Sequence, residues 1–324
     1  MKISAVDYHT AGEPFRIVTG GVAPLEGRTI LEKRRFAAER VDAVRRLLVN
    51  EPRGHADMYG CFVTEPEDDG ADLGVVFFHN AGYSTACGHG TIALATWAVD
   101  EGRVEPREPE TELVVDVPSG RLPVVVSVRE GRAERVRFRN VPAWVLAEGL
   151  DAGGVTADVS YGGAFYASVA APDLGLAVDA ASLPALIQGG RAVKRAIEAE
   201  HDVAHPDEPE IRGIYGVIFW QPEGGDPSAL VQRNVTVFAD GEVDRSPCGS
   251  GTSARLALLD ARGELERGAT LRHRSIVGTE FEGRVVEEVD GGVVTEIAGC
   301  AYRTGTHEFT LDPADELGTG FLLR

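Results

Sequence analysis

The sequence lacks long hydrophobic runs. No apolar stretch in its 324 residues approaches the roughly 18 residues that a membrane-spanning helix needs. The first residues, Met-Lys-Ile-Ser-Ala-Val-Asp, also lack the apolar centre of a signal peptide. Both absences predict a soluble, cytoplasmic protein that has no membrane partner.

Cysteine is scarce, and basic residues are in the minority. The 4 cysteines, at positions 61, 87, 248 and 300, form no Cys-x-x-Cys pair. We therefore expect free thiols in a reducing compartment and no metal site. The 32 basic residues face 51 acidic ones, for a net charge of −19. This balance excludes nucleic acid and anionic membrane surfaces as partners and is typical of a well-solvated surface.

The chain is long and apolar enough to fold. Its 324 residues suffice for two modest domains or one large one, and its 43% hydrophobic content excludes general disorder. Short Val/Phe/Tyr-rich runs separated by Gly, Pro and Asp predict strands. The predicted strands are 2–6, 15–19, 58–64, 74–79, 112–117, 122–129, 134–140, 155–161, 164–169, 214–220, 230–238, 270–273, 279–289 and 292–297. Helical patterns cover 32–48, 91–99, 182–199 and 252–260.

Two short segments match each other. Residues 86–91 read Ala-Cys-Gly-His-Gly-Thr, and residues 247–252 read Pro-Cys-Gly-Ser-Gly-Thr. Each lies between a predicted strand and an alanine-rich predicted helix. Cys248 follows Cys87 by 161 residues (248 minus 87), about half of the chain. This spacing is typical of a duplicated lobe.

The repeated segment suits proton transfer at a carbon beside a carboxylate. Free N–H groups at a helix start can hold a carboxylate, and glycines let the backbone approach it closely. The same positive field lowers the pKa of a thiol, so we expect thiolate character near neutral pH. Inversion at carbon needs an acid/base group on each face, which Cys87 and Cys248 would supply.

The two segments are also compatible with other interpretations. Each cysteine can be an inert, buried small residue with glycines present for packing. A phosphate loop is disfavoured, because no Walker lysine follows and the dinucleotide glycine spacing is absent. An amino-acid-binding module with unreactive thiols remains a third hypothesis, outside catalysis.

Several segments together resemble the proline racemase family over nearly the whole chain. That family includes proline racemase, 4-hydroxyproline 2-epimerase and trans-3-hydroxy-L-proline dehydratase. The matching segments are 7–14 (DYHTAGEP), 51–60 (EPRGHADMYG), 79–84 (HNAGYS), 87–90 (CGHG), 161–166 (YGGAFY) and 244–252 (DRSPCGSGT).

The resemblance implies an α+β fold like that of diaminopimelate epimerase. Two pseudo-symmetric lobes would each wrap a β-barrel-like sheet around a central helix, with the active site in the cleft between them. We expect an N-terminal lobe at 1–125, with 305–324 packing back on it, and a C-terminal lobe at 126–304. The resemblance implies no cofactor and a proline or hydroxyproline substrate. A homodimer is the assembly that we consider.

The resemblance also assigns roles. Cys87 and Cys248 match the two acid/base thiols of the family. His89 and Asp244 match the residues that help to hold the substrate amine and tune the thiols. The amides expected to bind the substrate carboxylate belong to Gly88, His89, Gly249 and Ser250.

The branch of the family is indicated less directly. Racemases and epimerases carry Cys at both catalytic positions, whereas dehydratases generally have Thr at the second, so Cys248 favours inversion. The segments 79–84 and 161–166 look more like the dehydratase branch, and Ala86 matches neither. We predict a cofactor-independent racemase or epimerase of proline or hydroxyproline. The alternative is trans-3-hydroxy-L-proline dehydratase, a lyase that uses the same α-proton abstraction.

A few further residues are candidates for the site. His55 and Asp57 would support it or be satisfied in a turn. The aromatic side chains of Tyr161, Phe165 and Tyr166 would line a pyrrolidine-sized pocket or pack in the core.

Overall fold

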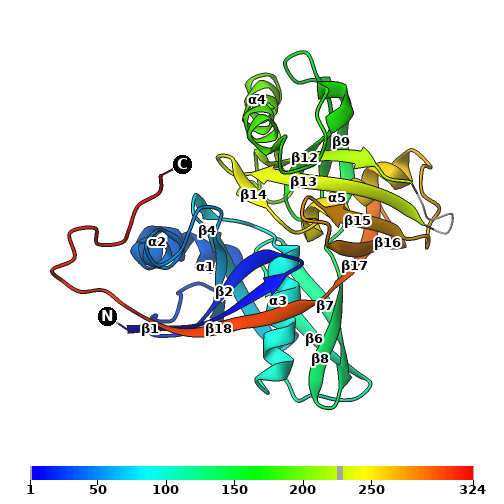
Figure 1. Ribbon diagram of the computed structural model, residues 1–324. Helices are drawn as coiled ribbons and strands as arrows, with labels where there is room; N and C mark the ends of the chain where they lie inside the picture. Colours follow the sequence, from blue (N-terminus) through cyan, green and yellow to red (C-terminus); the bar gives the residue numbers. More distant parts are fainter. Residues whose placement is uncertain (1, 225–228, 324) are drawn as a thin grey trace. The chain divides into compact units, whose positions relative to one another are not determined.

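The computed structural model describes residues 2–224 and 229–323, which form two compact units (Figure 1). Unit 1 comprises Met1–Val136 and Cys300–Arg324, and unit 2 comprises Arg137–Gly299. The boundary thus falls at Val136, whereas residue 125 lies inside strand β7 (Gly120–Arg129).

Unit 1 consists of strands around one long helix. The strands are β1 (Lys2–Thr10), β2 (Glu13–Gly20), β3 (Tyr59–Thr64), β4 (Leu73–His79), β5 (Gly82–Tyr83), β6 (Glu110–Val117), β7, β8 (Arg132–Arg139, which runs into unit 2) and β18 (Ala301–Thr310). The helical segments are α1 (Ile30–Phe36), η1 (Ala37–Val41), α2 (Asp42–Val49) and α3 (Gly88–Asp100).

The strands of unit 1 pair in the order β18–β1–β2–β3–β4–β6–β7. The β2–β3 and β4–β6 pairs are parallel and the others are antiparallel, while β5 returns against β4. Helix α3 contacts β1, β2, β18, β6 and β7 (Figure 1). Every residue from Gly88 to Val99 is buried, which explains why this helix is apolar or small on all sides.

Unit 2 likewise consists of strands around one central helix. Its strands are β9 (Trp144–Asp151), β10 (Thr156–Tyr161), β11 (Phe165–Ala170), β12 (Ile214–Pro222), β13 (Leu230–Phe238), β14 (Glu242–Asp244), β15 (Leu271–Ser275), β16 (Glu280–Val289) and β17 (Gly292–Gly299). The helical segments are η2 (Ala171–Leu174), α4 (Leu183–Glu200) and α5 (Gly249–Ala261).

The pairing of unit 2 repeats that of unit 1. The order is β9–β10–β11–β12–β13–β15–β16–β17, with β11–β12 and β13–β15 parallel and β14 returning against β13. Helix α5 contacts β9, β10, β11, β16 and β17, as α3 contacts its own strands. The duplication suggested by the two cysteine segments therefore extends to strand order and direction throughout each unit.

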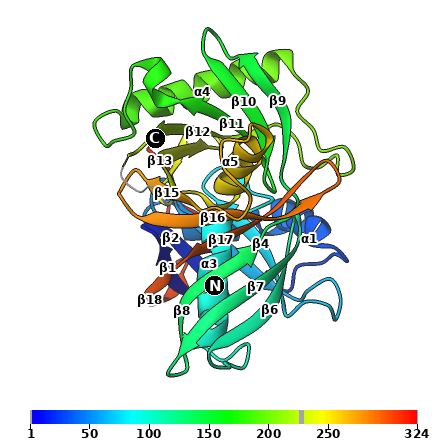
Figure 2. The same ribbon diagram turned by 90° about the vertical axis from the view of Figure 1, so that its right-hand side faces the viewer.

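Helices α1, α2 and α4 lie outside the sheets. Ile30, Leu47 and Leu48 pack on Phe62 and Phe78 in the core of unit 1. Helix α4 lies against β12 and β13 (Figure 2). Its Gly189-Gly190 pair continues the helix, and a Cβ on Gly190 would come within 2.9 Å of Val237 Cβ, so close packing requires glycine there.

Two sequence-based expectations about local structure need correction. The single helix predicted over 32–48 is three segments, because the π-helical turn η1 separates α1 from α2. Strands β5, β9, β14 and β18 were not predicted; β5 and β14 are only 2 and 3 residues long, and β9 and β18 carry polar residues on an exposed face. The 14 predicted strands all have counterparts in the structure, with ends that differ by a few residues. Among the described residues, no helix combines the length and apolar character needed to cross a membrane.

Candidate active site

Cys87 is the N-cap residue of α3. Its backbone is extended, with φ −155°, and its Sγ accepts a hydrogen bond from Gly90 N at 3.3 Å. Its carbonyl oxygen accepts two bonds from Thr91, one from N and one from Oγ1, each at 2.9 Å. The thiol is 5% exposed. The first turn of the helix thus holds the sulfur atom in a fixed, nearly buried position.

The imidazole of His89 lies beside this thiol. Cys87 Sγ is 3.5 Å from Nε2 and 3.7 Å from Nδ1 of His89. The rings of Phe15 and Tyr59, which are register partners on β2 and β3, stand edge-on to the imidazole at centroid distances of 5.6 Å and 4.9 Å. Thr10 Oγ1 donates to His89 O at 2.9 Å. His89 therefore keeps one orientation next to Cys87.

The glycines of the two segments are required by space. A Cβ on Gly90 would lie 2.7 Å from Cys87 Sγ and 2.5 Å from Phe15, and one on Gly251 would lie 2.9 Å from Cys248 Sγ. Both distances are shorter than carbon and sulfur tolerate. In each unit the sulfur atom occupies the place that a side chain at the third helical position would fill.

Cys248 begins α5 in a different way. Its φ is +60°, in the left-handed region that favours glycine, and its Sγ makes no capping bond. A non-glycine residue there stores strain of about 1–3 kcal/mol, which surrounding contacts must hold. Cys248 N donates to Ser246 Oγ at 3.1 Å, and Ser246 N donates to Asp244 Oδ1 at 2.8 Å. The turn before α5 is therefore fixed by side-chain hydrogen bonds.

Tyr166 of β11 completes the surroundings of Cys248. Its hydroxyl lies 3.8 Å from Cys248 Sγ and 2.7 Å from Ser250 Oγ, and its ring is fully buried. Of the three aromatic residues singled out from the sequence, Tyr166 is the one that reaches the thiol. Tyr161 and Phe165 instead pack with Trp144 in a separate aromatic cluster.

Phe15 in unit 1 and Tyr166 in unit 2 occupy corresponding positions beside the two central helices. Phe15 and Tyr166 each stand three positions after a glycine with positive φ, Gly12 at +94° and Gly163 at +98°. Each side chain then meets the second residue of the central helix, His89 in unit 1 and Ser250 in unit 2. The sequence could have shown this correspondence, because Gly12 lies between β1 and β2 and Gly163 lies between the matching strands β10 and β11.

The protonation state of Cys248 differs from the sequence-based expectation. Burial, and then the charge of nearby Asp244, raise the pKa of the Cys248 thiol to about 12, although the Gly251 N–H and the Tyr166 hydroxyl favour the thiolate. Burial also raises the pKa of Tyr166 well above its usual range. The expectation of a lowered thiol pKa is wrong here, since desolvation outweighs the helix start. At neutral pH Cys248 is a thiol, which is the form that gives a proton.

The expected carboxylate-binding amides lie in the first turn of each helix. Gly88 and His89 open α3, and Gly249 and Ser250 open α5. The N–H groups at the first positions of a helix have no acceptor within the helix, which is the arrangement that binds anions.

Other candidates lie elsewhere. His55 is exposed, and its Nδ1 is 2.7 Å from the carbonyl of Ala56. Asp57 is buried at φ +65°. Cys61 is fully buried and burial raises its thiol pKa beyond the usual range, while Cys300 is partly exposed. The described residues contain no cluster of His, Cys, Asp and Glu suited to a metal ion.

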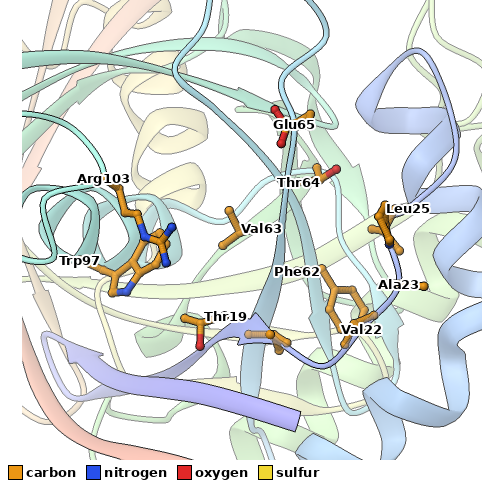
Figure 3. Close-up of a pocket in the computed structure, with 13 residues that line it drawn as sticks. Thr19, Val22, Ala23, Leu25, Phe62, Val63, Thr64, Glu65, Trp97 and Arg103 are labelled. Atoms are coloured by element: carbon orange, nitrogen blue, oxygen red, sulfur yellow. The ribbon is translucent and has the colours of Figure 1, made fainter.

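A separate cavity of about 290 Å³ lies in unit 1. Figure 3 shows Trp97 and Arg103 on one side of it and Phe62, Val22 and Leu25 on the other. Trp97 is ten residues after Cys87 (97 minus 87), roughly 15 Å along α3. This cavity therefore lies near the opposite end of the helix from the thiol.

Comparisons with known proteins identify the family of this chain. The family model described as "Proline racemase" matches residues 5–322. The chain is 44% identical over 335 residues to "Trans-3-hydroxy-L-proline dehydratase" of Bacillus thuringiensis subsp. konkukian, covering 100% of both chains. It is 46% identical over 332 residues to "3-hydroxyproline 2-epimerase" of Burkholderia multivorans, covering 100% of this chain and 98% of that one.

A solved structure shares the fold. It is a hydroxyproline epimerase from Agrobacterium vitis with bound trans-4-hydroxy-L-proline. The TM-score is 0.90 at 31% identity, over 99% of this chain and 96% of that chain. The resemblance and the fold class predicted from the sequence are thereby confirmed.

Proposed function

Because the chain belongs to the proline racemase family, we propose that it is a cofactor-independent 3-hydroxyproline 2-epimerase in which Cys87 and Cys248 act on opposite faces of the α-carbon. The cysteine at both helix starts is the observation that carries this proposal. The relatives at 44% and 46% identity that are named for 3-hydroxyproline favour this substrate over proline.

The roles of the two thiols follow from their surroundings. Cys87, as the thiolate, is the base that takes the α-proton from the L-substrate and becomes the neutral thiol, and the imidazole of His89 at 3.5 Å stabilises the thiolate before this transfer. Cys248, protonated at neutral pH, returns a proton to the other face and becomes the thiolate. The reverse reaction exchanges the two roles.

Substrate binding is assigned to the helix starts and their neighbours. The N–H groups of Gly88 and His89, and those of Gly249 and Ser250, hold the carboxylate and stabilise the charge that develops on it when the α-proton leaves. Asp244 pairs with the substrate amine, which also removes its unfavourable effect on the Cys248 thiolate.

Proton NMR in deuterated water tests the reaction. We expect trans-3-hydroxy-L-proline to gain deuterium at C2 and to be converted to cis-3-hydroxy-D-proline. L-proline and trans-4-hydroxy-L-proline serve as comparison substrates. Turnover of none of the three would overturn the proposal and favour a binding module instead.

Dehydration is the second candidate, because several relatives at 42–46% identity carry the name trans-3-hydroxy-L-proline dehydratase. In that reaction the α-proton and the C3 hydroxyl leave together as water, and a pyrroline carboxylate remains. Cys248 would then protonate the leaving hydroxyl instead of C2. Two observations would identify this outcome. The NMR signal of the proton on the hydroxyl-bearing C3 would disappear, and borohydride would reduce the product to proline.

A further inference from the structure

The hydroxyl of Thr252 lies under the first turn of α5. Thr252 Oγ1 donates to the carbonyl of Cys248 at 2.7 Å, and the carbonyl of Pro247 lies 3.2 Å away. On its other side the same oxygen lies 2.8 Å from Nδ1 of His273. A hydroxyl has only one proton, so an oxygen that donates to a carbonyl must accept from His273.

His273 is therefore the donor, and its proton is on Nδ1. The ring is fully buried on β15, and burial together with the charge of Arg255 lowers the pKa of His273 to about 3. A neutral imidazole has a single N–H, and here Nδ1 carries it. Nε2 is then an acceptor, and it has no partner among the described residues.

Arg255 lies on the same interior surface. Its Nε donates to Gln232 Oε1 at 3.0 Å, and Gln232 is the register partner of His273 on the neighbouring strand. Its guanidinium stacks on Trp220 at 3.9 Å, and it has no hydrogen bond to a carboxylate among the described residues. A cation at this place keeps His273 neutral and able to donate only one bond.

The carbonyl that Thr252 holds belongs to the peptide between Cys248 and Gly249. A peptide unit is planar, so the direction of that carbonyl fixes the opposite direction of the Gly249 N–H. Thr252 N also donates to this carbonyl, at 2.7 Å. Cys248 has a left-handed φ of +60°, which residues other than glycine rarely adopt. These contacts therefore hold the Cys248–Gly249 peptide plane in an orientation that the backbone at Cys248 disfavours.

Unit 1 lacks this support. Thr91 Oγ1 donates to the carbonyl of Cys87 in the same way, at 2.9 Å, but no described side chain donates to Thr91. Cys87 is extended at φ −155°, which any residue adopts without strain. The additional donor thus occurs where the backbone conformation needs it.

We propose that His273 is a positioning residue that, through Thr252, directs the Gly249 N–H toward the carboxylate of the substrate. The identity of that ligand rests on the proposed function. His273 touches neither thiol nor substrate. Its contribution is to keep the hydroxyl of Thr252 pointing at the Cys248 carbonyl.

Nitrogen NMR on protein with ¹⁵N-labelled histidine tests the hydrogen-bond direction without any substrate. We expect His273 to be the Nδ1–H tautomer at pH 7, with its assignment made from the His273→Asn variant. An Nε2–H tautomer would overturn the proposal, because Thr252 would then have to donate to His273 and release the carbonyl.

Binding of pyrrole-2-carboxylate, a planar carboxylate with the shape of deprotonated proline, tests the consequence. His273→Leu should weaken binding roughly tenfold, as expected for a misdirected hydrogen bond to a charged group. His273→Asn should stay within about threefold of the wild type, since its amide nitrogen can replace Nδ1 as the donor. Thermal melts identify any variant that fails to fold.

A double-mutant cycle separates positioning from general packing. Thr252→Val removes the hydroxyl, and Thr252→Ser keeps it. His273→Leu should weaken binding in the Thr252→Ser background and have little further effect in the Thr252→Val background. Equal effects of His273→Leu in both backgrounds would overturn the proposal.

Failure of this inference is distinguishable from failure of the proposed function. If the wild type binds pyrrole-2-carboxylate but turns over no substrate, the proposed function fails while the cycle still decides the role of His273. If the wild type epimerises substrate and His273→Leu binds the probe normally, only the inference fails. If the wild type does not bind the probe, the ligand assignment fails and the tautomer decides the hydrogen-bond direction.

Discussion

The starts of helices α3 and α5 share a cysteine followed by two glycines, but they differ in the backbone at the cysteine and in the side chains around it. In unit 1 Cys87 is extended, caps its helix, and lies beside the imidazole of His89. In unit 2 Cys248 is left-handed, makes no cap, and lies near the hydroxyl of Tyr166 and the charge of Asp244. One thiol has a basic neighbour, and the other is kept protonated.

The two central helices also differ in the side chain that they bury at one matched position, which is apolar in α3 and charged in α5. Leu94, fully buried in α3, occupies the position 161 residues before Arg255 in α5 (255 minus 94). The apolar side chain needs no partner, whereas the buried cation is accompanied by polar side chains on β13 and β15. The two units thus share strand order and the position of the cysteine, while the interiors of their central helices differ in charge.

Removal of each thiol should produce the largest difference. Cys87→Ser and Cys248→Ser should each lower the rate of C2 inversion by about 10³-fold, since serine is a poor acid and base at neutral pH. Only Cys248→Ser should still exchange the α-proton of the L-substrate with deuterated water, because its Cys87 base remains. Cys300→Ser is the control, since Cys300 lies outside both helix starts. Inversion by either active-site variant at a rate within about tenfold of the wild type would refute the two-thiol mechanism.

Substitution at the two matched interior positions should have different effects on the free energy of unfolding. Leu94→Ala should reduce the free energy of unfolding by about 2–5 kcal/mol, because it leaves a cavity in a fully buried site. Arg255→Met should change it by less than about 1 kcal/mol or raise it, since the side chain keeps its length and loses an unpaired buried charge. Urea unfolding measures both. Equal destabilisation would mean that Arg255 has a strong stabilising partner.

Acid should destabilise unit 2 through His273. Its folded pKa of about 3 lies below the ordinary 6.5, so the unfolded chain binds the proton first and stability falls as pH drops below 6.5. The loss at pH 5 relative to pH 7 is about 2 kcal/mol. Urea unfolding at both pH values should show this loss in the wild type and a smaller one in His273→Asn. An identical loss in the variant would show that other groups dominate.

The smallest expected effect concerns Asp244 and the reactivity of Cys248. Because the pKa of the Cys248 thiol is about 12, alkylation of Cys248 by iodoacetamide should accelerate about tenfold per pH unit between pH 7 and 10. Asp244→Asn should make alkylation faster at each pH, since the carboxylate raises the thiol pKa. Mass spectrometry of the labelled peptide measures the rate. Asp240→Asn, at an exposed residue four positions earlier, is the control and should change nothing.

Much of the fold could be predicted from the sequence, because buried strands such as β4 and β13 have continuous apolar runs. Strands β9 and β18 escaped since their exposed faces carry polar residues, for example Glu148 and Arg303. The π turn inside 32–48 changes the apolar spacing by a single step, five residues from Phe36 to Val41, which is too small a signal to divide the predicted helix.

The residues at the two helix starts could be identified from the sequence, whereas their surroundings could not. The repeated glycines and cysteines have local causes, namely helix starts and close packing. The protonation of Cys248 depends on burial and on Asp244, which are tertiary effects. The difference between Tyr161 and Tyr166 depends on strand register, and the contact of His273 with Thr252 joins residues 21 apart on different elements.

The pairing of β18 with β1 has a consequence for how the chain is made. β1 leaves the ribosome before any of unit 2, and its partner β18 leaves only after all of unit 2, with Lys2 opposite Thr310 and Thr10 opposite Ala301. Unit 2 is one continuous stretch and can complete its sheet while unit 1 still lacks an edge partner for β1. The half that is translated first is therefore the half that finishes folding last.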